Sequence, residues 1–324
     1  MACFLCAVLA VVALGAALKV YLKLTTRWNR SYVSLIGKTA IITGANTGIG
    51  YYTALDFAKR GARVILACRN QNKAEKALKE ILKVTGNQNV VIKLVDMASL
   101  QSVRDFAEDI NRSEDRLDIL VNNAGIAIQS ENYTKDGNQT VLQVNHISAF
   151  LLTHLLIEKL KKTGRSRIVN VSSIVAKNAP LTVAKLEKFN QALPPTAFIS
   201  EMYYNSKLCN ILFTIELARR LSGTEVTVNA LHPGVVYSDF FRDMPSYVQT
   251  IAKILGNLYL LTPEEGAQTQ IYLSVSNEVE GISGGLFANC KQIGIYKTAK
   301  NPDLVQKVWS KTEELAKLRD NEKI

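Results

Sequence analysis

Cysteine is scarce in this chain, and its thiols are scattered. Five occur among 324 residues, an odd number, and no spacing between them suits a zinc site. They are Cys3, Cys6, Cys68, Cys209 and Cys290. A disulfide framework is therefore not expected, and the globular part should face a reducing compartment.

The sequence also lacks the residue patterns of a metal site and of a nucleic-acid-binding segment. The three histidines, His146, His154 and His232, have no metal-ligand spacing, so structural roles are expected for them and no metal site is expected. The formal net charge is +11, but no block rich in Lys and Arg with interleaved aromatic residues occurs. An anionic membrane surface or cofactor therefore accounts for the basic balance better than nucleic acid does.

The middle of the chain lacks linkers, repeats and low-complexity stretches. From Lys38 onward, apolar runs rich in Val and Ile alternate with amphipathic stretches. Strands are expected at 39–43, 63–67, 90–95, 119–122, 167–171, 226–231 and 285–288, and helices at 50–59, 71–85, 99–111, 137–163, 201–221 and 263–275. This alternation predicts a doubly wound parallel α/β sheet of the Rossmann type over residues 38–296.

Local signals mark several helix ends. Ser99 is a plausible N-cap. Pro263, followed by two acidic residues, is typical of a helix start. Residues 297–324 are expected to form a carboxy-terminal tail with a helix over about 303–318.

The amino terminus differs from the rest of the chain. Residues 2–18 carry no charge and are nearly all apolar, and after Lys19 the apolar stretch continues to residue 22. Its length is at the short edge of a spanning helix, which needs roughly 17–25 residues. We expect an uncleaved anchor over residues 2–22, with a cleaved signal peptide as the alternative.

The charges that follow the apolar segment predict its orientation. Lys19, Lys23, Arg27 and Arg30 lie on its carboxyl side, and the basic linker extends over residues 23–37. By the positive-inside rule the rest of the chain should lie in the cytoplasm.

Four sequons favour the opposite placement. They begin at Asn29, Asn111, Asn132 and Asn138. In a lumenal or secreted protein they would be glycan acceptors. Short sequons occur often by chance, so the charge rule is given more weight.

A glycine-rich turn follows the first expected strand. Gly44, Gly48 and Gly50 stand where the strand passes into a helix, and small residues there let the backbone approach a pyrophosphate. The expected cofactor turn comprises Gly44, Ala45, Asn46, Thr47, Gly48, Ile49 and Gly50. Its spacing is not Gly-x-Gly-x-x-Gly, and an ordinary glycine-rich turn is the alternative.

The end of the second strand bears on cofactor choice. It reads Ala67-Cys68-Arg69, where a cofactor without the 2′-phosphate would usually find an acid. Arg69 instead offers a planar cation suited to a phosphate, which favours NADP over NAD. The alternative is that Arg69 is a solvated strand-end charge.

A tyrosine and a lysine four residues apart supply acid–base chemistry. Tyr203 and Lys207 share one helical face, and a positive charge near a tyrosine favours its phenolate. Together with the glycine turn they predict hydride transfer between a nicotinamide cofactor and a carbonyl or alcohol. Tyr204, three residues before Lys207, is the rival acid.

This ordered set of motifs resembles the short-chain dehydrogenase/reductase family over about residues 38–294. The motifs are Thr43-Gly44-x-x-x-Gly48-x-Gly50, Asn122-Asn123-Ala124-Gly125, Asn145, Ser173, Tyr203-x-x-x-Lys207 and Pro233-Gly234. The residues around these motifs, such as Val144-Asn145-His146 and Asn205-Ser206-Lys207-Leu208, are similar to the microsomal retinol dehydrogenase subgroup. That resemblance implies an amino-terminal anchor in the endoplasmic reticulum membrane, NADP, and reduction of retinal or other apolar aldehydes.

Two features depart from the subgroup. They are the pair Tyr51-Tyr52 and the segment 178–200, which lie where substrate selection is expected. Segments 178–200 and 239–261 are both too long for simple connections, and such loops often shape a binding site.

The resemblance also implies a role for each matching residue of the catalytic set. Tyr203 would donate a proton to the carbonyl oxygen, beside Lys207. Ser173, rather than its neighbour Ser172, would bond the substrate oxygen. Asn145 would hold a water that links Lys207 to solvent.

On the cofactor side, the resemblance places Asp96 at the adenine and Asn122 near the adenosine ribose. Ser238 would bond the nicotinamide carboxamide. For Asn122, turn chemistry of an Asn-Asn pair is the alternative.

The sequence thus predicts an NADP(H)-dependent oxidoreductase that interconverts an apolar aldehyde or ketone and its alcohol. Retinoids, lipid aldehydes, isoprenoids and steroids are candidate substrates, and reduction is the favoured direction because cytoplasmic NADP is held mainly reduced. The alternative is an inactive NADP-binding scaffold or sensor at the membrane. A homo-oligomer is left open.

Overall fold

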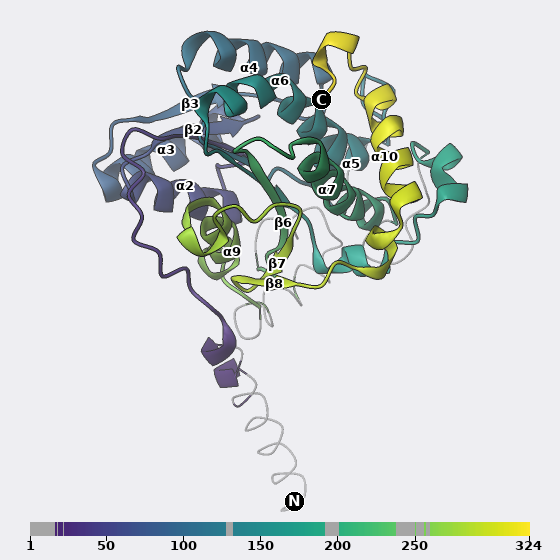
Figure 1. Ribbon diagram of the computed structural model, residues 1–324. Coiled ribbons are helices and arrows are strands. Elements are labelled where there is room, and N and C mark those ends of the chain that lie inside the picture. The colour runs from purple at the N-terminus through teal and green to yellow at the C-terminus, as the bar shows by residue number, and fades with distance from the viewer. Residues whose placement is uncertain are drawn as a thin grey trace, which may run out of the picture.

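An eight-stranded sheet runs through the middle of the structure (Figure 1). The computed structural model describes residues 17, 19–21, 23–127, 132–191, 201–237, 250, 256 and 260–324. The strands are β1 (Thr39–Thr43), β2 (Arg63–Cys68), β3 (Val90–Leu94), β4 (Ile119–Asn122), β5 (Arg167–Val171), β6 (Thr227–His232), β7 (Leu286–Ala288) and β8 (Lys291–Ile293). Their order is β3-β2-β1-β4-β5-β6-β7-β8.

The strand order reverses at β1, which makes the sheet doubly wound. β1 pairs in parallel with β2 on one side and with β4 on the other, so that Ile41 lies between Ile65 and Leu120. All five residues of β1 are buried. A continuous apolar strand of this kind is typical of a parallel sheet with helices on both faces. Ligands in such folds bind outside the carboxyl ends of the strands, at the switch point.

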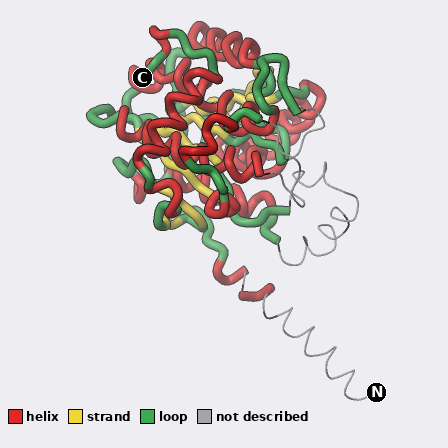
Figure 2. The backbone as a smooth tube through the Cα atoms, turned by 90° about the vertical axis from the view of Figure 1, so that its right-hand side faces the viewer, coloured by secondary structure: helices red, strands yellow, loops and turns green. Residues whose placement is uncertain are grey.

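Helices cover both faces of the sheet (Figure 2). One layer consists of α2 (Gly48–Lys59), α3 (Gln71–Thr85) and α9 (Pro263–Val275). The other consists of α4 (Leu100–Ser113), α5 (Thr140–Leu142), α6 (Ser148–Thr163), α7 (Glu201–Arg220) and α10 (Pro302–Leu315). Each layer has its own cluster of buried apolar side chains against the sheet. The predicted Rossmann-type architecture is confirmed.

The helix ends agree with the local signals. The Ser99 hydroxyl accepts a hydrogen bond from the Ser102 backbone N–H at 3.2 Å. Pro263 is the first residue of α9. Thr262, the N-cap residue, forms a capping box with Glu265 in the first turn. The predicted N-cap and the predicted proline start are therefore confirmed.

The helix predicted over residues 137–163 is interrupted. It consists of α5, a five-residue π-helix η1 (Gln143–Ile147) and α6. This apolar stretch is long enough to cross a membrane, but nearly all of its most apolar part is buried inside the domain. It is a core helix. A single turn of π-helix inside an α-helix, such as η1 (the π-turn), often marks a functional site.

The antiparallel edge strand β8 was not expected from the sequence. It spans three residues and pairs with β7 across the turn at Asn289 and Cys290. Both turn residues have positive φ, 49° and 53°. Asn289 is of a type that adopts positive φ more readily than most residues, but no glycine marks this turn in the sequence.

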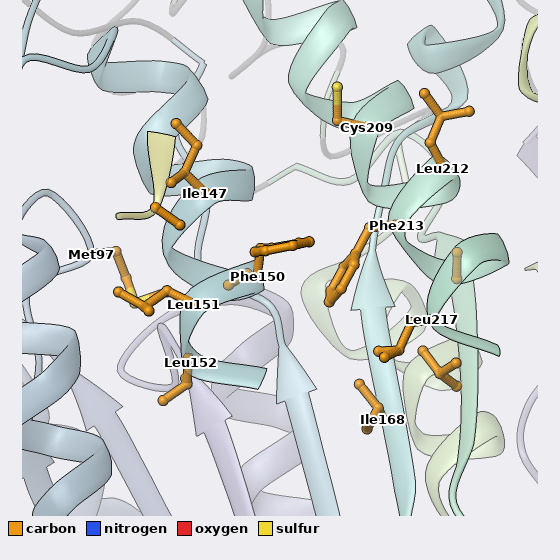
Figure 3. Packing of buried hydrophobic residues seen from close by; sticks show 14 of the residues in the cluster. Met97, Ile147, Phe150, Leu151, Leu152, Ile168, Cys209, Leu212, Phe213 and Leu217 are labelled. Atoms are coloured by element: carbon orange, nitrogen blue, oxygen red, sulfur yellow. The ribbon is translucent and has the colours of Figure 1, made fainter. Parts of the chain in front are cut away.

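The last helix is packed into the core rather than lying apart from it. The ring of Trp309 on α10 lies 4.9 Å from Phe150 and 5.8 Å from Phe213, measured between centroids. Phe150 and Phe213 face one another from α6 and α7, 5.0 Å apart (Figure 3). The segment expected as a tail is thus part of the same hydrophobic cluster.

Residues 23–37, predicted as a linker, lie along the domain. The guanidinium of Arg60 donates to the carbonyls of Ser31 and Val33 at 2.7 and 3.0 Å. The backbone N–H of Asn29 donates to Gln268 on α9 at 3.1 Å. Most of the expected anchor, residues 2–22, lies outside the described residues.

Candidate active site

The glycine turn connects β1 to α2 at the switch point. Gly44 and Gly48 have φ of +67° and +59°, conformations that favour glycine. The N-cap residue of α2, Thr47, makes no side-chain cap hydrogen bond. The first N–H groups of α2 are therefore available to an anion, which the helix dipole also favours.

Asn123 and Thr43 hold this turn in place; both stand in the motifs of the family resemblance, but neither was given a role of its own from the sequence. The Asn123 side chain donates to the carbonyl of Thr43 at 2.7 Å, and the Asn123 backbone N–H donates to the Thr43 hydroxyl at 2.9 Å. A Cβ on Gly50 would lie 2.5 Å from both Asn123 Nδ2 and the Gly44 carbonyl oxygen. Gly50 is thus required by close packing between the turn and the end of β4. The Asn-Asn doublet after an apolar run was the available signal.

Arg69 and Asp96 lie side by side beyond the ends of β2 and β3. The Arg69 guanidinium is 4.0 Å from the Asp96 carboxylate, and both side chains are substantially exposed. The same carboxylate accepts from the Ala98 backbone N–H at 3.0 Å. An exposed pair of this kind contributes little to stability, so it is available to a ligand.

Tyr203, Ser173 and Lys207 meet where β5 ends against α7. Tyr203 and Lys207 are both buried, and the Lys207 ammonium lies 5.7 Å from the Tyr203 ring centroid. Ser173 follows β5 as the N-cap of the short helix η2 (Ile174–Asn178), and its hydroxyl is hydrogen-bonded to Tyr203. The structure thus brings together the predicted proton donor, Tyr203, the lysine beside it and the serine predicted to bond the substrate oxygen.

Burial dominates the ionisation of this pair. Desolvation raises the pKa of Tyr203 to about 12, although the hydrogen bond with Ser173 works in the opposite direction. Desolvation also lowers the pKa of Lys207 to about 8. The lowered tyrosine pKa expected from the sequence therefore does not arise from the protein's own groups.

Asn145 lies in the π-turn η1, close to Lys207. Its side chain donates to the Ile126 carbonyl at 2.9 Å and to the Ser206 hydroxyl at 3.0 Å. A Cβ on Gly125 would lie 3.1 Å from the Lys207 ammonium and 3.3 Å from Asn145 Oδ1. Gly125 therefore lets these two groups approach the same small space.

Asn122 is placed differently from the other expected cofactor residues. It is buried in β4, and its side chain donates to Asn170 at 2.8 Å and to Thr153 at 3.0 Å. Its amide nitrogen thus ties β4 to β5 and α6, while its buried Oδ1 has no hydrogen-bond partner among the described residues.

The neighbours of the expected catalytic residues have other partners. The Ser172 hydroxyl donates to the Lys207 carbonyl at 2.6 Å and so ties β5 to α7. Tyr204 is half-buried and packs against the apolar cluster. Ser238 lies outside the described residues.

The Tyr51-Tyr52 pair, expected where the substrate is selected, belongs to the other helical layer. The two rings lie edge to face, 5.2 Å apart, against the cluster of α2, α3 and α9. Tyr51 is hydrogen-bonded to Glu80 on α3. Their position indicates packing between helices rather than substrate contact.

Two of the three histidines lie in the core of the domain. His146 and His154 are buried, and burial lowers the pKa of each to about 4. Across the residues that the structure describes, no group of three or more His, Cys, Asp and Glu side chains could hold a metal ion.

Comparisons with known proteins agree with this geometry. A family model described as short chain dehydrogenase matches residues 38–185. The chain is 42% identical over 313 residues to "Dehydrogenase/reductase SDR family member 13" of Bos taurus, an alignment that covers 95% of this chain and 81% of that protein. It is 43% identical over 284 residues to "Retinol dehydrogenase 11" of Mus musculus, with 86% of each covered.

A crystal structure is also similar. It is of a Beutenbergia cavernae protein described as an NAD(P) dependent gluconate 5-dehydrogenase, with NADP bound at low occupancy. The TM-score is 0.63 at 26% identity, and 79% of this chain and 96% of that chain are covered. The chain belongs to the short-chain dehydrogenase/reductase family, and its relatives include retinol dehydrogenases. This fold binds a nicotinamide dinucleotide.

Replacing Gly50 by Ala tests the turn. The new methyl group would overlap Asn123 and the Gly44 carbonyl, so the turn must shift. Overpacking of this kind typically costs about 1–3 kcal/mol. We expect a clear loss of dinucleotide affinity in a fluorescence titration with NADPH.

The matched control is Gly294→Ala. Nothing lies within 4 Å of a Cβ at Gly294, and its φ is not in the left-handed region. This variant should bind NADPH as the parent does. Equal affinities in all three proteins would remove Gly50 from the cofactor site.

Proposed function

We propose that this chain is an NADP(H)-dependent oxidoreductase that reduces an apolar aldehyde or ketone to its alcohol. The observation that carries the proposal is the buried Tyr203 hydroxyl, hydrogen-bonded to Ser173 and flanked by the Lys207 ammonium. These three residues, at the carboxyl end of β5 and on α7, stand on the same edge of the sheet as the glycine turn.

The proposed roles follow from the ionisation of each group. A tyrosine with a raised pKa stays protonated at neutral pH and so serves as the proton donor in reduction. The Ser173 hydroxyl would donate a hydrogen bond to the carbonyl oxygen of the substrate and orient it toward Tyr203. The Lys207 ammonium stabilises the phenolate that remains after the proton has left. When bound, the cofactor would supply the hydride, and the glycine turn and the N-terminus of α2 would hold its pyrophosphate.

Tyr203→Phe tests the proton donor. It keeps the ring and its packing and removes only the hydroxyl, so NADPH should still bind while carbonyl reduction is largely lost. General acid catalysis typically contributes about 10²–10⁴-fold, which sets the expected loss in kcat. The assay is NADPH oxidation with retinal, steroid, isoprenoid and lipid aldehydes.

The matched control for this test is Tyr204→Phe. Tyr204 is half-buried against the apolar cluster, and its hydroxyl has no proposed role in the reaction. It should retain most of the activity. The proposal fails if Tyr203→Phe turns over near the parent rate or if Tyr204→Phe is the inactive variant.

We propose NADP as the cofactor on the basis of Arg69. Its exposed guanidinium lies past the end of β2, next to Asp96, where the 2′-position of an adenosine ribose is expected in this fold. A 2′-phosphate would pair with Arg69, and Asp96 would lie at the adenine.

Arg69→Glu should therefore change the cofactor preference. The lost charge-assisted contacts are worth about 1.5–3 kcal/mol, or roughly ten- to hundredfold in affinity for NADP. The measurement is the ratio of NADPH to NADH dissociation constants. An unchanged ratio would show that Arg69 does not contact the cofactor.

The proposed substrate class rests on the relatives. One protein named "Retinol dehydrogenase 11", of Mus musculus, is 43% identical to this chain over 284 residues. Retinal and other apolar aldehydes are therefore the first compounds to assay.

We further propose that residues 2–22 anchor the chain in the endoplasmic reticulum membrane and that residues 38–296 form the catalytic domain on its cytoplasmic side. Two of the sequon asparagines do not count against this placement. Asn138 is buried and its amide donates to the Leu315 carbonyl at 3.1 Å. The amide nitrogen of Asn29 is also buried. Neither could carry a glycan in this fold.

Protease added to intact microsomes tests the topology. The domain should be digested without detergent, and Asn132, whose side chain is exposed, should carry no glycan. Protection from protease together with an endoglycosidase-sensitive mass shift would place the domain in the lumen instead.

A further inference from the structure

A buried chain of hydrogen bonds between polar groups runs from the active site to α10. It begins at Asn210, seven residues after Tyr203 and three after Lys207, so the three side chains share one side of α7. The Asn210 amide nitrogen donates to the Asn145 carbonyl at 3.0 Å and to the Val171 carbonyl at 3.1 Å. The Val171 carbonyl also accepts from the Lys207 ammonium, at 3.2 Å. One carbonyl oxygen thus joins Lys207 to Asn210.

These contacts fix the orientation of the Asn210 amide. The two carbonyls can only accept, so the NH₂ group must face them and Oδ1 must face the other way. Oδ1 lies 3.1 Å from Nδ1 of His146, which sits in the π-turn η1 directly after Asn145. Nδ1 must therefore carry a proton.

The tautomer of His146 then follows. Burial lowers the pKa of its imidazole to about 4, so the ring is neutral at physiological pH and Nε2 can only accept. Nε2 lies 3.0 Å from the hydroxyl of Thr312 on α10. That hydroxyl also lies 2.7 Å from the Val308 carbonyl in its own helix. The hydroxyl has one proton, which is therefore shared between two acceptors, Nε2 and the Val308 carbonyl. Among the described residues, Thr312 is the side-chain partner of Nε2.

We propose that Asn210 and His146 are positioning residues of the active site, and that the Thr312 hydroxyl on α10 completes their hydrogen-bond chain. This inference rests on the proposed reductase function. The chain locks two carbonyls that neighbour the reacting groups: that of Val171, which holds Lys207, and that of Asn145, which lies in the π-turn. Without this chain, the Val171 carbonyl that binds Lys207 and the Asn145 carbonyl in the π-turn each lose a donor. The glycine turn, at the other end of the site, keeps its own contacts.

Three variants test the proposal in the full chain. Asn210→Leu removes both donors, Thr312→Val removes the hydroxyl at nearly constant shape, and Thr312→Ser keeps it. Misplacing a catalytic group by a fraction of an ångström to 1 Å costs up to about a hundredfold, so kcat of Asn210→Leu should fall roughly ten- to hundredfold. Thr312→Val should lose less, and Thr312→Ser should match the parent. The NADPH dissociation constant should be unchanged in all three.

The kcat values are expressed per NADPH-binding site, so that misfolded protein does not count. His154→Leu is the control for a general loss of packing. His154 is also buried, and among the described residues its hydrogen bond is with the Phe150 carbonyl of its own helix. This variant should lose stability and keep its kcat per site. Parent-like kcat per site in Asn210→Leu, or equal losses in Thr312→Ser and Thr312→Val, would overturn the proposal.

A second measurement does not depend on turnover. The chain has three histidines, so their imidazole ¹⁵N signals are few, and His154→Leu identifies one of them. His146 should appear as the Nδ1–H tautomer in the parent and lose that preference in Asn210→Leu. An Nε2–H tautomer in the parent would contradict the chain. If the parent protein reduces no carbonyl compound with NADPH, the proposed function fails, and the ¹⁵N spectrum still decides whether the hydrogen-bond chain exists.

Discussion

The burial of one lysine ammonium constrains most of this site. Lys207 is 4% exposed, and its recorded hydrogen bond is to the Val171 carbonyl at the end of β5. A buried cation is costly unless backbone oxygens or a counter-charge surround it, and the cost appears here as a pKa lowered to about 8. The fold meets this demand with the end of β5, with the π-turn around Asn145, and with the absence of a side chain at Gly125.

The same burial places the hydroxyl of Tyr203 among protein groups, Ser173 and Lys207, rather than in water. Tyr203 is buried beside Lys207, and desolvation keeps it protonated until a substrate oxygen accepts its proton. The cofactor end of the site obeys a different rule, since there the backbone must come close to an anion. Positive φ at Gly44 and Gly48 and the tight contact at Gly50 provide that approach. The two halves meet because parallel strands end at one edge of the sheet.

Much of this arrangement could be predicted from the sequence because it depends on local patterns. The expected ranges of β1, β4, β5, α3 and α9 match the observed ones, since apolar runs and helix-end signals are encoded within the elements themselves. The spacing of Tyr203 and Lys207 placed them on one helical face, and the structure brings Ser173 to them. The residues implied by family resemblance mostly stand at the same edge of the sheet.

What the sequence did not predict depends on tertiary contacts. The π-turn at Asn145 arises inside an otherwise regular apolar helix, and no residue type in it signals the change. Asn123 and Asn210 act through carbonyls that are distant in sequence. The core position of α10 depends on Trp309 reaching the aromatic side chains of α6 and α7. The Asn122 amide nitrogen donates to a neighbouring strand and helix, partners that the local sequence did not indicate, and its place near the ribose stays a prediction.

The most direct test of the account is the pH dependence of carbonyl reduction at saturating NADPH and aldehyde. If the buried Lys207 must be charged to stabilise the phenolate of Tyr203, kcat should be highest below its pKa of about 8 and should fall as the pH rises through that value. Far-ultraviolet circular dichroism at each pH would verify that the fold is intact. A kcat that stays constant from well below pH 8 to well above it would contradict the claim that the charge on this buried lysine drives the reaction.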